Sequence, residues 1–402
     1  MELQLRPLME LMNEALAATG GPYASVDEFI TDGEKSQTFI NDLMQENTSR
    51  HFSRKAEIGL SKVYRYSQER ARHIAISFLF GMVLSEFCSF YASLPEVLNR
   101  ENENAQMKAA LSQRMWLITS LSHDNGYALD ALSDRNLDFT TKYKRFLLTD
   151  DYNDPQMSSI AQFSQNYPKV FAHDYEQIRA YNDYIRKYKK WAPDHELNDH
   201  GILGGVDMFN HLTRNMQKLN DHDRYQELTL IKACCLTVAQ HNIFKSPEID
   251  SDGFYSEFNL DHLLSTSNFR ITRETPLLLF LCLVDTIECM KRFSKGATKG
   301  SYLQVTTILE KIYLYVDKDQ IVLDFSRLKK YIDEKDKSVT DDAKKLASTY
   351  DKYLNALTSF HTWTVFKGEA NPQHKNIITI TLAPSQKANH ELCVASEKCE
   401  GL

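Results

Sequence analysis

Hydrophobic residues recur at helical spacing through most of this chain. Positions three and four apart are apolar and the positions between them are polar, which is the pattern of amphipathic helices. In the densest stretches nearly every position is apolar, which predicts buried helices. The expected helices cover about 5–19, 26–44, 71–84, 107–122, 225–241, 277–292 and 340–361.

The pattern changes after Gly300. Residues 312–316 and 321–325 are rich in β-branched and aromatic side chains, and the polar stretch between them predicts a hairpin. Residues 376–382 are a further strand candidate. The expected fold class is therefore mainly α, with a helical bundle core and a small antiparallel β-sheet near the C-terminal end.

Four regions are expected along the chain. Residues 1–66 form an N-terminal helical segment, and residues 67–300 form the helical core. Within the core, about 130–197 is an insertion rich in Tyr, Asp, Asn and Lys, where loops and short helices are expected. Residues 301–384 form a small α+β appendage, and the polar residues 385–402 are expected to be disordered.

Composition and charge narrow the class of protein. Of the 402 residues, 42% are hydrophobic and 25% are charged, as in soluble globular proteins, and the formal net charge is -7. This charge disfavours nucleic acid as a partner. No apolar run approaches the ~20 residues of a membrane-spanning helix, and the first residues lack a secretory pattern. A cytoplasmic protein without a membrane partner is expected.

The seven cysteines agree with a reducing compartment. Their number is odd, and no CxxC pair occurs. Most lie in apolar helical patterns, where a free cysteine packs as a small hydrophobic residue. The cysteines in apolar patterns are Cys88, Cys234, Cys235, Cys282 and Cys289. The other two, Cys393 and Cys399, lie in the polar end of the chain.

Histidines and aspartates stand at or near the ends of several apolar helices. The adjacent pair His123 and Asp124 combines an imidazole with a carboxylate, which together can bind one divalent cation. Asp285 lies in an apolar helix, where a carboxylate is costly unless it is paired or bound to a cation. The full candidate set is His73, His123, Asp124, His200, His241 and Asp285.

These residues are too far apart in the chain for a zinc finger, so they predict a site assembled from separate helices of a bundle. The mixed nitrogen and oxygen donors suit Mn²⁺, Fe²⁺, Zn²⁺, Co²⁺ or Mg²⁺, and residue types alone do not decide the metal or whether one ion or two are bound. Other interpretations stay open for single residues. His73 can be a hydrogen-bonded core histidine, and Asp285 can form a salt bridge or a helix cap.

The order of these residues resembles the HD-domain superfamily of metal-dependent phosphohydrolases. Trp116-Leu-Ile-Thr-Ser-Leu-Ser-His-Asp-Asn-Gly-Tyr127 is similar to the apolar helix, His-Asp and Gly-Tyr of one branch of that superfamily. Asp199-His-Gly-Ile-Leu-Gly-Gly, Ala239-Gln-His-Asn-Ile and Leu283-Val-Asp-Thr-Ile look like its later ligand segments. The resemblance covers about 67–295 and implies an HD-type helical bundle.

The resemblance also implies which residues bind metal. His73, His123, Asp124 and Asp285 match the residues that hold the first metal in this superfamily. The remaining two candidates match the additional histidines of members that hold a second metal, and Asp124 would then bridge the two ions.

By this resemblance, the catalytic residues would be Asp124, His200 and His241. One segment departs from the pattern. Many phosphodiesterases of the superfamily have Gly-Lys after the His-Asp, whereas this chain has Asn125-Gly-Tyr, so a phosphate contact by such a lysine is not implied.

The function implied by the resemblance is hydrolysis of a nucleotide phosphoester by a metal-activated water. A phosphodiester or cyclic nucleotide is favoured over a deoxynucleoside triphosphate because of the additional histidines. Manganese is among the expected metals, and self-association into a homo-oligomer is left open. The alternative is a non-catalytic HD-fold nucleotide sensor or scaffold that uses the same pocket.

Overall fold

The structure is a computed structural model that describes most of the predicted helices and the sheet. The expected insertion over 130–197 and the expected disordered tail over 385–402 lie outside the described residues. The structure describes residues 4–48, 68–85, 91, 94, 104–124, 126, 200, 201, 204, 205, 208, 212, 220, 226, 227, 230, 231, 233–235, 237, 238, 241, 276–293, 299–317, 320–336, 341–359 and 367–382.

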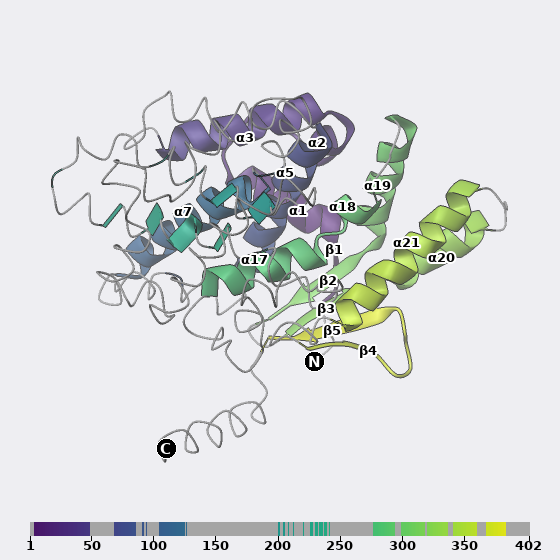
Figure 1. The fold of residues 1–402 in the computed structure, drawn as a ribbon. Helices are drawn as coiled ribbons and strands as arrows, with labels where there is room; N and C mark the ends of the chain where they lie inside the picture. Colours follow the sequence, from purple (N-terminus) through teal and green to yellow (C-terminus); the bar gives the residue numbers. More distant parts are fainter. Residues whose placement is uncertain are drawn as a thin grey trace, which may run out of the picture. The chain divides into compact units, whose positions relative to one another are not determined.

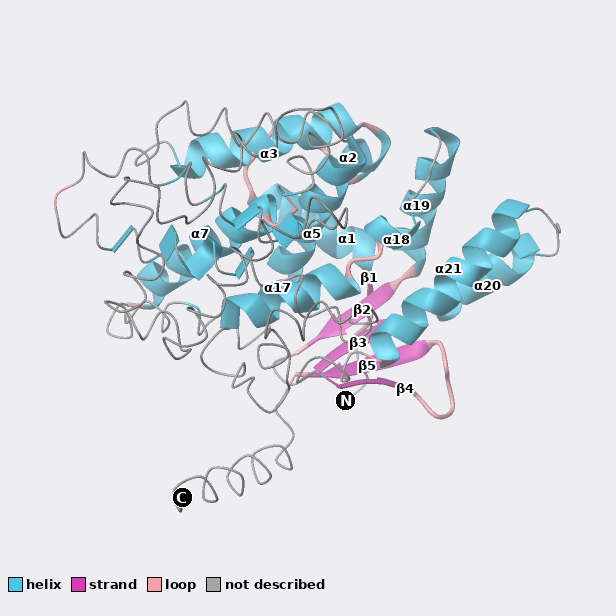
Figure 2. Ribbon diagram, in the orientation of Figure 1, coloured by secondary structure: helices cyan, strands magenta, loops and turns pink. Residues whose placement is uncertain are grey.

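The chain divides into two compact units. The first comprises Met1–Thr31, Met82–Ser89 and Thr286–Leu402, and the second comprises Asp32–Gly81 and Phe90–Asp285. The four domain ranges expected from the sequence stay a prediction. The fold class is confirmed, because the described residues are mostly helical and include a small antiparallel sheet (Figure 2).

The sheet belongs to the first unit and has the strand order β1-β2-β3-β5-β4, with every neighbouring pair antiparallel. The predicted hairpin is confirmed between β2 and β3, where the Asp317 carboxylate accepts a hydrogen bond from the Gln320 amide at 2.8 Å. Strands β1 and β4 were not predicted, because they are too short or too polar to show alternation. The strands are β1 (Arg6–Pro7), β2 (Tyr313–Val316), β3 (Gln320–Asp324), β4 (Lys367–Ala370) and β5 (Ile377–Thr381).

Helices pack on this sheet and on each other. Helix α21 contacts β4 and β5 and lies beside α20 (Figure 1), and α19 contacts α1 and α2. Helices α19 and α20 were not predicted, since α19 has several β-branched residues and α20 is strongly charged. The helices of the first unit are α1 (Leu8–Ala18), α2 (Asp27–Thr31), α18 (Met290–Phe293), α19 (Lys299–Lys311), α20 (Ser326–Asp336) and α21 (Asp341–Thr358).

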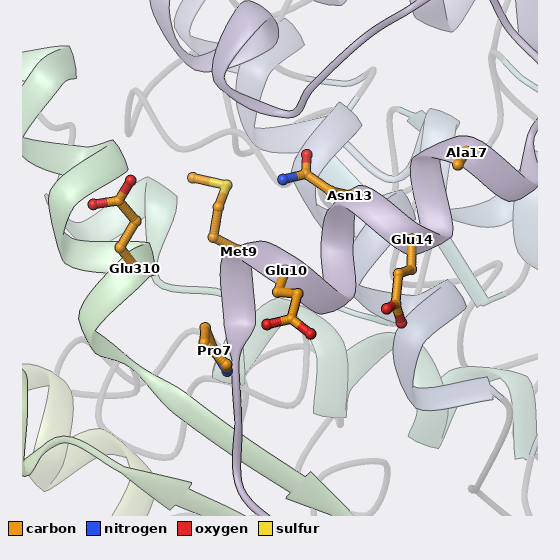
Figure 3. A pocket seen from close by; sticks show the side chains of 7 residues that line it. All are labelled: Pro7, Met9, Glu10, Asn13, Glu14, Ala17 and Glu310. Atoms are coloured by element: carbon orange, nitrogen blue, oxygen red, sulfur yellow. The ribbon is translucent and has the colours of Figure 1, made fainter.

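A hollow of about 530 Å³ lies on the first unit, along α1 (Figure 3). Its lining is apolar apart from Asn13 and the carboxylates of Glu10, Glu14 and Glu310. Arg6 forms ion pairs with both Glu10 and Glu14, which offsets much of this negative charge. None of the six candidate ligands lies in this unit.

The second unit contains α3 (Gly33–Thr48), most of α5 (Gln68–Ser85), α7 (Ala105–Ser122) and most of α17 (Pro276–Ile287). Helix α17 begins at Pro276, one residue before the start expected from the sequence. Helix α7 begins after Asn104, whose side chain accepts a hydrogen bond from the Met107 amide at 2.9 Å and so caps the helix. Among the described residues, no helix has the length and apolar character needed to cross a membrane.

Two expected helices are each divided in two. The expected 26–44 helix breaks at Asp32, whose carboxylate accepts from the Glu34 amide at 2.9 Å and caps α3. The expected 277–292 helix breaks after α17, where Glu288 accepts hydrogen bonds from the amides of Met290 and Lys291. In both cases an acidic side chain accepts the hydrogen bond of a backbone amide in place of a helical carbonyl oxygen. The spacing of apolar residues does not reveal such a cap.

Candidate metal centre

Three helices that carry candidate ligands meet at one tryptophan. Trp116 of α7 is fully buried, and its Nε1–H donates to the carbonyl oxygen of Phe78 in α5 at 3.1 Å. Its indole also meets the ring of Phe280 in α17 edge to face, with ring centroids 4.7 Å apart. Through these two contacts Trp116 joins α7 to α5 and α17, which are labelled in Figure 1.

The first group of ligand atoms belongs to His73, His123 and Asp285. His73 lies within α5, Asp285 lies within α17, and His123 directly follows α7. The Nε2 atoms of the two histidines are 3.3 Å apart. The Asp285 Oδ1 atom lies 3.3 Å from His73 Nε2 and 3.8 Å from His123 Nε2. All three side chains are buried, and their ligand atoms lie within 4.8 Å of one another, so they could hold a metal ion.

The second group consists of Asp124, His200 and His241. Their ligand atoms also lie within 4.8 Å of one another, and all three residues are buried. The rings of His200 and His241 meet edge to face, with centroids 5.1 Å apart. This group too could hold a metal ion, and its members come from three segments far apart in the chain.

The Asp124 carboxylate lies between the two groups. Its Oδ2 atom is 3.6 Å from His73 Nε2, and its Oδ1 atom is 3.5 Å from His200 Nε2. The rings of His123 and His241 are also close, with centroids 5.5 Å apart. The structure thus brings together all six residues singled out in the sequence, in one buried cluster within the second unit.

Backbone carbonyls orient two of the imidazoles. The Nδ1–H group of His123 donates to the Ser120 carbonyl oxygen at 2.7 Å, and that of His241 donates to the Val238 carbonyl oxygen at 2.6 Å. A carbonyl oxygen can only accept, so both Nδ1 atoms carry a proton and are occupied by the backbone. The Nε2 atom of His123 faces the cluster, 3.7 Å from Asp124 Oδ1 and 3.8 Å from Asp285 Oδ1, as in a metal-binding histidine whose other nitrogen is held by a second partner.

A close contact between two backbones positions His200. Gly126 lies so near the His200 carbonyl that a Cβ atom at Gly126 would stand 1.8 Å from that oxygen. Gly204, on the same helical segment as His200, faces the backbone of Gly126 in turn. Glycine at these two positions lets the two backbones approach this closely.

Arg70 is a member of this cluster that the sequence did not single out. Its Nη1 atom donates to Asp124 Oδ2 at 2.7 Å. Arg70 lies one helical turn before His73 on α5, so helical spacing places both on the same face. That spacing is the signal in the sequence that could have identified it.

Basic residues that could meet a phosphate are Arg72, Arg114, Lys245, Lys291 and Arg292. Arg114 forms a two-point ion pair with Glu227, which ties α7 to the helical residues between 226 and 238. Lys291 and Arg292 belong to the first unit, and Lys245 lies outside the described residues.

Comparison with known proteins identifies no relative. No protein-family model, no curated protein and no solved structure matches the chain significantly.

The donor atoms of this cluster fit a divalent metal. The carboxylates of Asp124 and Asp285 are buried beside imidazole nitrogens, and their oxygens lie 3.3 to 3.8 Å from those nitrogens. The Nε2 atoms of His73 and His123 lie 3.3 Å from each other. The Nε2 atom of His123 faces the Oδ1 atoms of both Asp124 and Asp285, at 3.7 and 3.8 Å, so two carboxylates converge on one space. A cation between such groups removes their mutual repulsion, and mixed nitrogen and oxygen donors suit first-row divalent metals.

Proposed function

We propose that this protein is an HD-type metal-dependent phosphohydrolase that cleaves a phosphoester bond of a nucleotide. The observation that carries the proposal is the burial of Asp124 and Asp285 among four imidazoles, in two groups whose ligand atoms each lie within 4.8 Å of one another. The order of the ligand residues, which resembles that of HD-domain enzymes, supports the same assignment.

The residues have distinct parts in this proposal. His73, His123, Asp124 and Asp285 would hold one ion, and His200 and His241 would hold a second that shares Asp124. Divalent ions bound here would supply Lewis acidity, which lowers the pKa of a coordinated water to roughly 7 and neutralises charge on phosphoryl oxygens. The two carboxylate oxygens of Asp124 face different histidines, Oδ2 toward His73 and Oδ1 toward His200, which supports a bridging role.

The protein's own groups prepare the site before any substrate arrives. The Ser120 and Val238 carbonyls accept hydrogen bonds from the Nδ1–H groups of His123 and His241 and so hold each ring in one orientation. Burial of all six side chains keeps bulk water away and strengthens electrostatic interactions with the substrate. A cyclic or linear phosphodiester nucleotide is the favoured substrate class, and the net charge of -7 disfavours a nucleic-acid polymer.

The test combines metal analysis with a substrate panel. Purified protein is analysed for bound transition metals, supplied with Mn²⁺, and assayed for hydrolysis of cyclic dinucleotides, cyclic mononucleotides and deoxynucleoside triphosphates. Asp124→Ala and Asp285→Ala are expected to abolish both metal binding and hydrolysis. His200→Ala and His241→Ala are expected to lose activity while one ion stays bound.

Lys329→Gln serves as a control, because Lys329 is an exposed residue of α20 in the other unit. Protein without bound metal, and without hydrolysis of any nucleotide in the presence of Mn²⁺, would refute the enzyme. Metal or nucleotide binding without hydrolysis would favour the non-catalytic sensor. Full activity of His241→Ala would refute the second ion.

A further inference from the structure

Arg70 places a permanent positive charge on the carboxylate that both groups of ligands share. The guanidinium Nη1 donates to Asp124 Oδ2 at 2.7 Å, closer to this carboxylate than the 3.5 to 3.7 Å of the histidine nitrogens that face it. Arg70 therefore stands where a cation would be most strongly attracted. Arginine stays charged at every relevant pH, so this contact does not depend on protonation.

The charge balance explains why the guanidinium lies there. Asp124 and Asp285 bring two carboxylates into a buried site. A buried carboxylate is costly without a compensating charge. Arg70 supplies one positive charge, and a divalent cation would supply two.

Arg70 also has a way out of the site. Its side chain is 30% exposed, while the Asp124 side chain is fully buried. A long, flexible arginine at such a boundary can move its guanidinium into solvent while its aliphatic part stays packed. Asp124 cannot follow it.

We propose that Arg70 is a built-in counter-ion of Asp124 that competes with a divalent cation and thereby sets the metal affinity of this centre. The proposal rests on the proposed function in that it takes the cluster to be a metal site. When a cation binds, the guanidinium gives up Asp124 Oδ2 and turns toward solvent. Without metal, the ion pair keeps the buried carboxylate compensated and the cluster in place.

Removal of this competing charge should tighten metal binding. An Arg70→Gln protein no longer has to break a charge-assisted hydrogen bond when the cation arrives, so its Kd for Mn²⁺ is expected to fall about tenfold or more. The same substitution should lower the melting temperature of the metal-free protein. In an Asp124→Asn background, Arg70→Gln should have little further effect on the melting temperature, because the charge pair is already lost.

The experiment is a calorimetric titration of Mn²⁺ into the chelator-treated full chain. Wild type is compared with Arg70→Gln and Arg70→Met, with Arg70→Lys retaining the charge and Lys329→Gln serving as the control outside the site. The expected order of affinity is Gln and Met tightest, with Lys closer to wild type. Melting temperatures of the four metal-free proteins of the Arg70/Asp124 cycle are measured in parallel.

Each outcome decides between the two proposals. If wild type and Arg70→Gln bind Mn²⁺ equally well, or Arg70→Gln binds it more weakly, the competition is refuted while the metal site stands. If Arg70→Gln binds Mn²⁺ and wild type does not, the competition is supported in its strongest form. If none of the variants binds Mn²⁺, Zn²⁺ or Fe²⁺, the metal site itself is refuted and the competition with it.

Discussion

Single proton positions decide which atoms this cluster presents. His123 and His241 each follow the C-terminal end of a helical segment, and there a carbonyl three residues earlier takes up the Nδ1 proton. The sequence singled out the six candidate ligand residues, and the structure places them in two buried groups. The sequence did not give the orientation of their rings, because it does not give the backbone geometry at the end of a helix.

A side chain at Gly126 should disturb the second group of candidate ligands. Gly126→Ala would place a Cβ atom 1.8 Å from the His200 carbonyl oxygen, so the segment carrying His200 has to shift away from Asp124. The expected result is that metal stoichiometry, measured by elemental analysis after dialysis against Mn²⁺, falls from two ions to one. Two ions bound by Gly126→Ala would contradict the prediction.

Gly204→Ala is the matched control for this experiment. A Cβ atom there would stand 3.0 Å from the Gly126 amide nitrogen, which requires a shift of only a few tenths of an ångström. Its effect on the second ion should therefore be smaller than that of Gly126→Ala.

The buried cysteines are expected to be unreactive in the folded protein. Burial raises the pKa of the Cys234 thiol to about 12 and the pKa of Cys289 well above its usual value. Both thiols should therefore resist Ellman's reagent at pH 8 and react fully after unfolding in guanidinium chloride. Fast labelling of either residue in the native protein, located by mass spectrometry, would contradict their burial.

The same shift gives a pH dependence of stability. The thiol pKa is higher in the folded state than in the unfolded state, where it is about 8.5. The contribution of Cys234 to stability is therefore complete below about pH 8.5 and declines as the pH rises toward 12.

At the scale of elements, α5, α7 and α17 form the support of the site through Trp116. The sequence predicted all three helices, because each is long and apolar. It did not predict the breaks at Asp32 and Glu288, whose carboxylates accept hydrogen bonds from the first amides of the helices that follow, α3 and α18. Local capping of this kind competes with periodicity and is weak in the sequence.

Gly81→Ala tests the role of Trp116. A Cβ atom at Gly81 would lie 2.1 Å from the indole Cζ2 atom, and the indole is fully buried and cannot move away. Alanine normally favours a helix over glycine, but here overpacking should cost about 1–3 kcal/mol of the free energy of unfolding. Urea denaturation measures this value, and a protein as stable as wild type would contradict the packing.

At the scale of the whole molecule, the candidate centre belongs to one unit and the sheet to the other. All six candidate ligand residues lie in the unit made of Asp32–Gly81 and Phe90–Asp285. The first and last of them, His73 and Asp285, are 212 positions apart in the chain. In the first unit, β1 pairs with β2, so residues 6–7 lie beside residues 313–314 although they are far apart in the chain.

Metal binding should stabilise the folded protein as a whole. A ligand that binds only the folded state at 100 times its Kd adds about 2.7 kcal/mol to the free energy of unfolding. Mn²⁺ should therefore raise the melting temperature of wild type in differential scanning calorimetry and leave that of Asp285→Ala unchanged. An equal rise in both proteins would show that the ion acts elsewhere.

The sequence by itself determined the helical content, the hairpin and the six residues with metal-binding chemistry. Helix and strand periodicity are local properties, and residue type sets what a side chain can bind. Only the tertiary structure decided that these six side chains meet, that two imidazoles direct Nε2 inward, and that Arg70 joins Asp124. These features depend on distances between segments far apart in the chain, which packing around Trp116 and Gly126 sets and which no local pattern records.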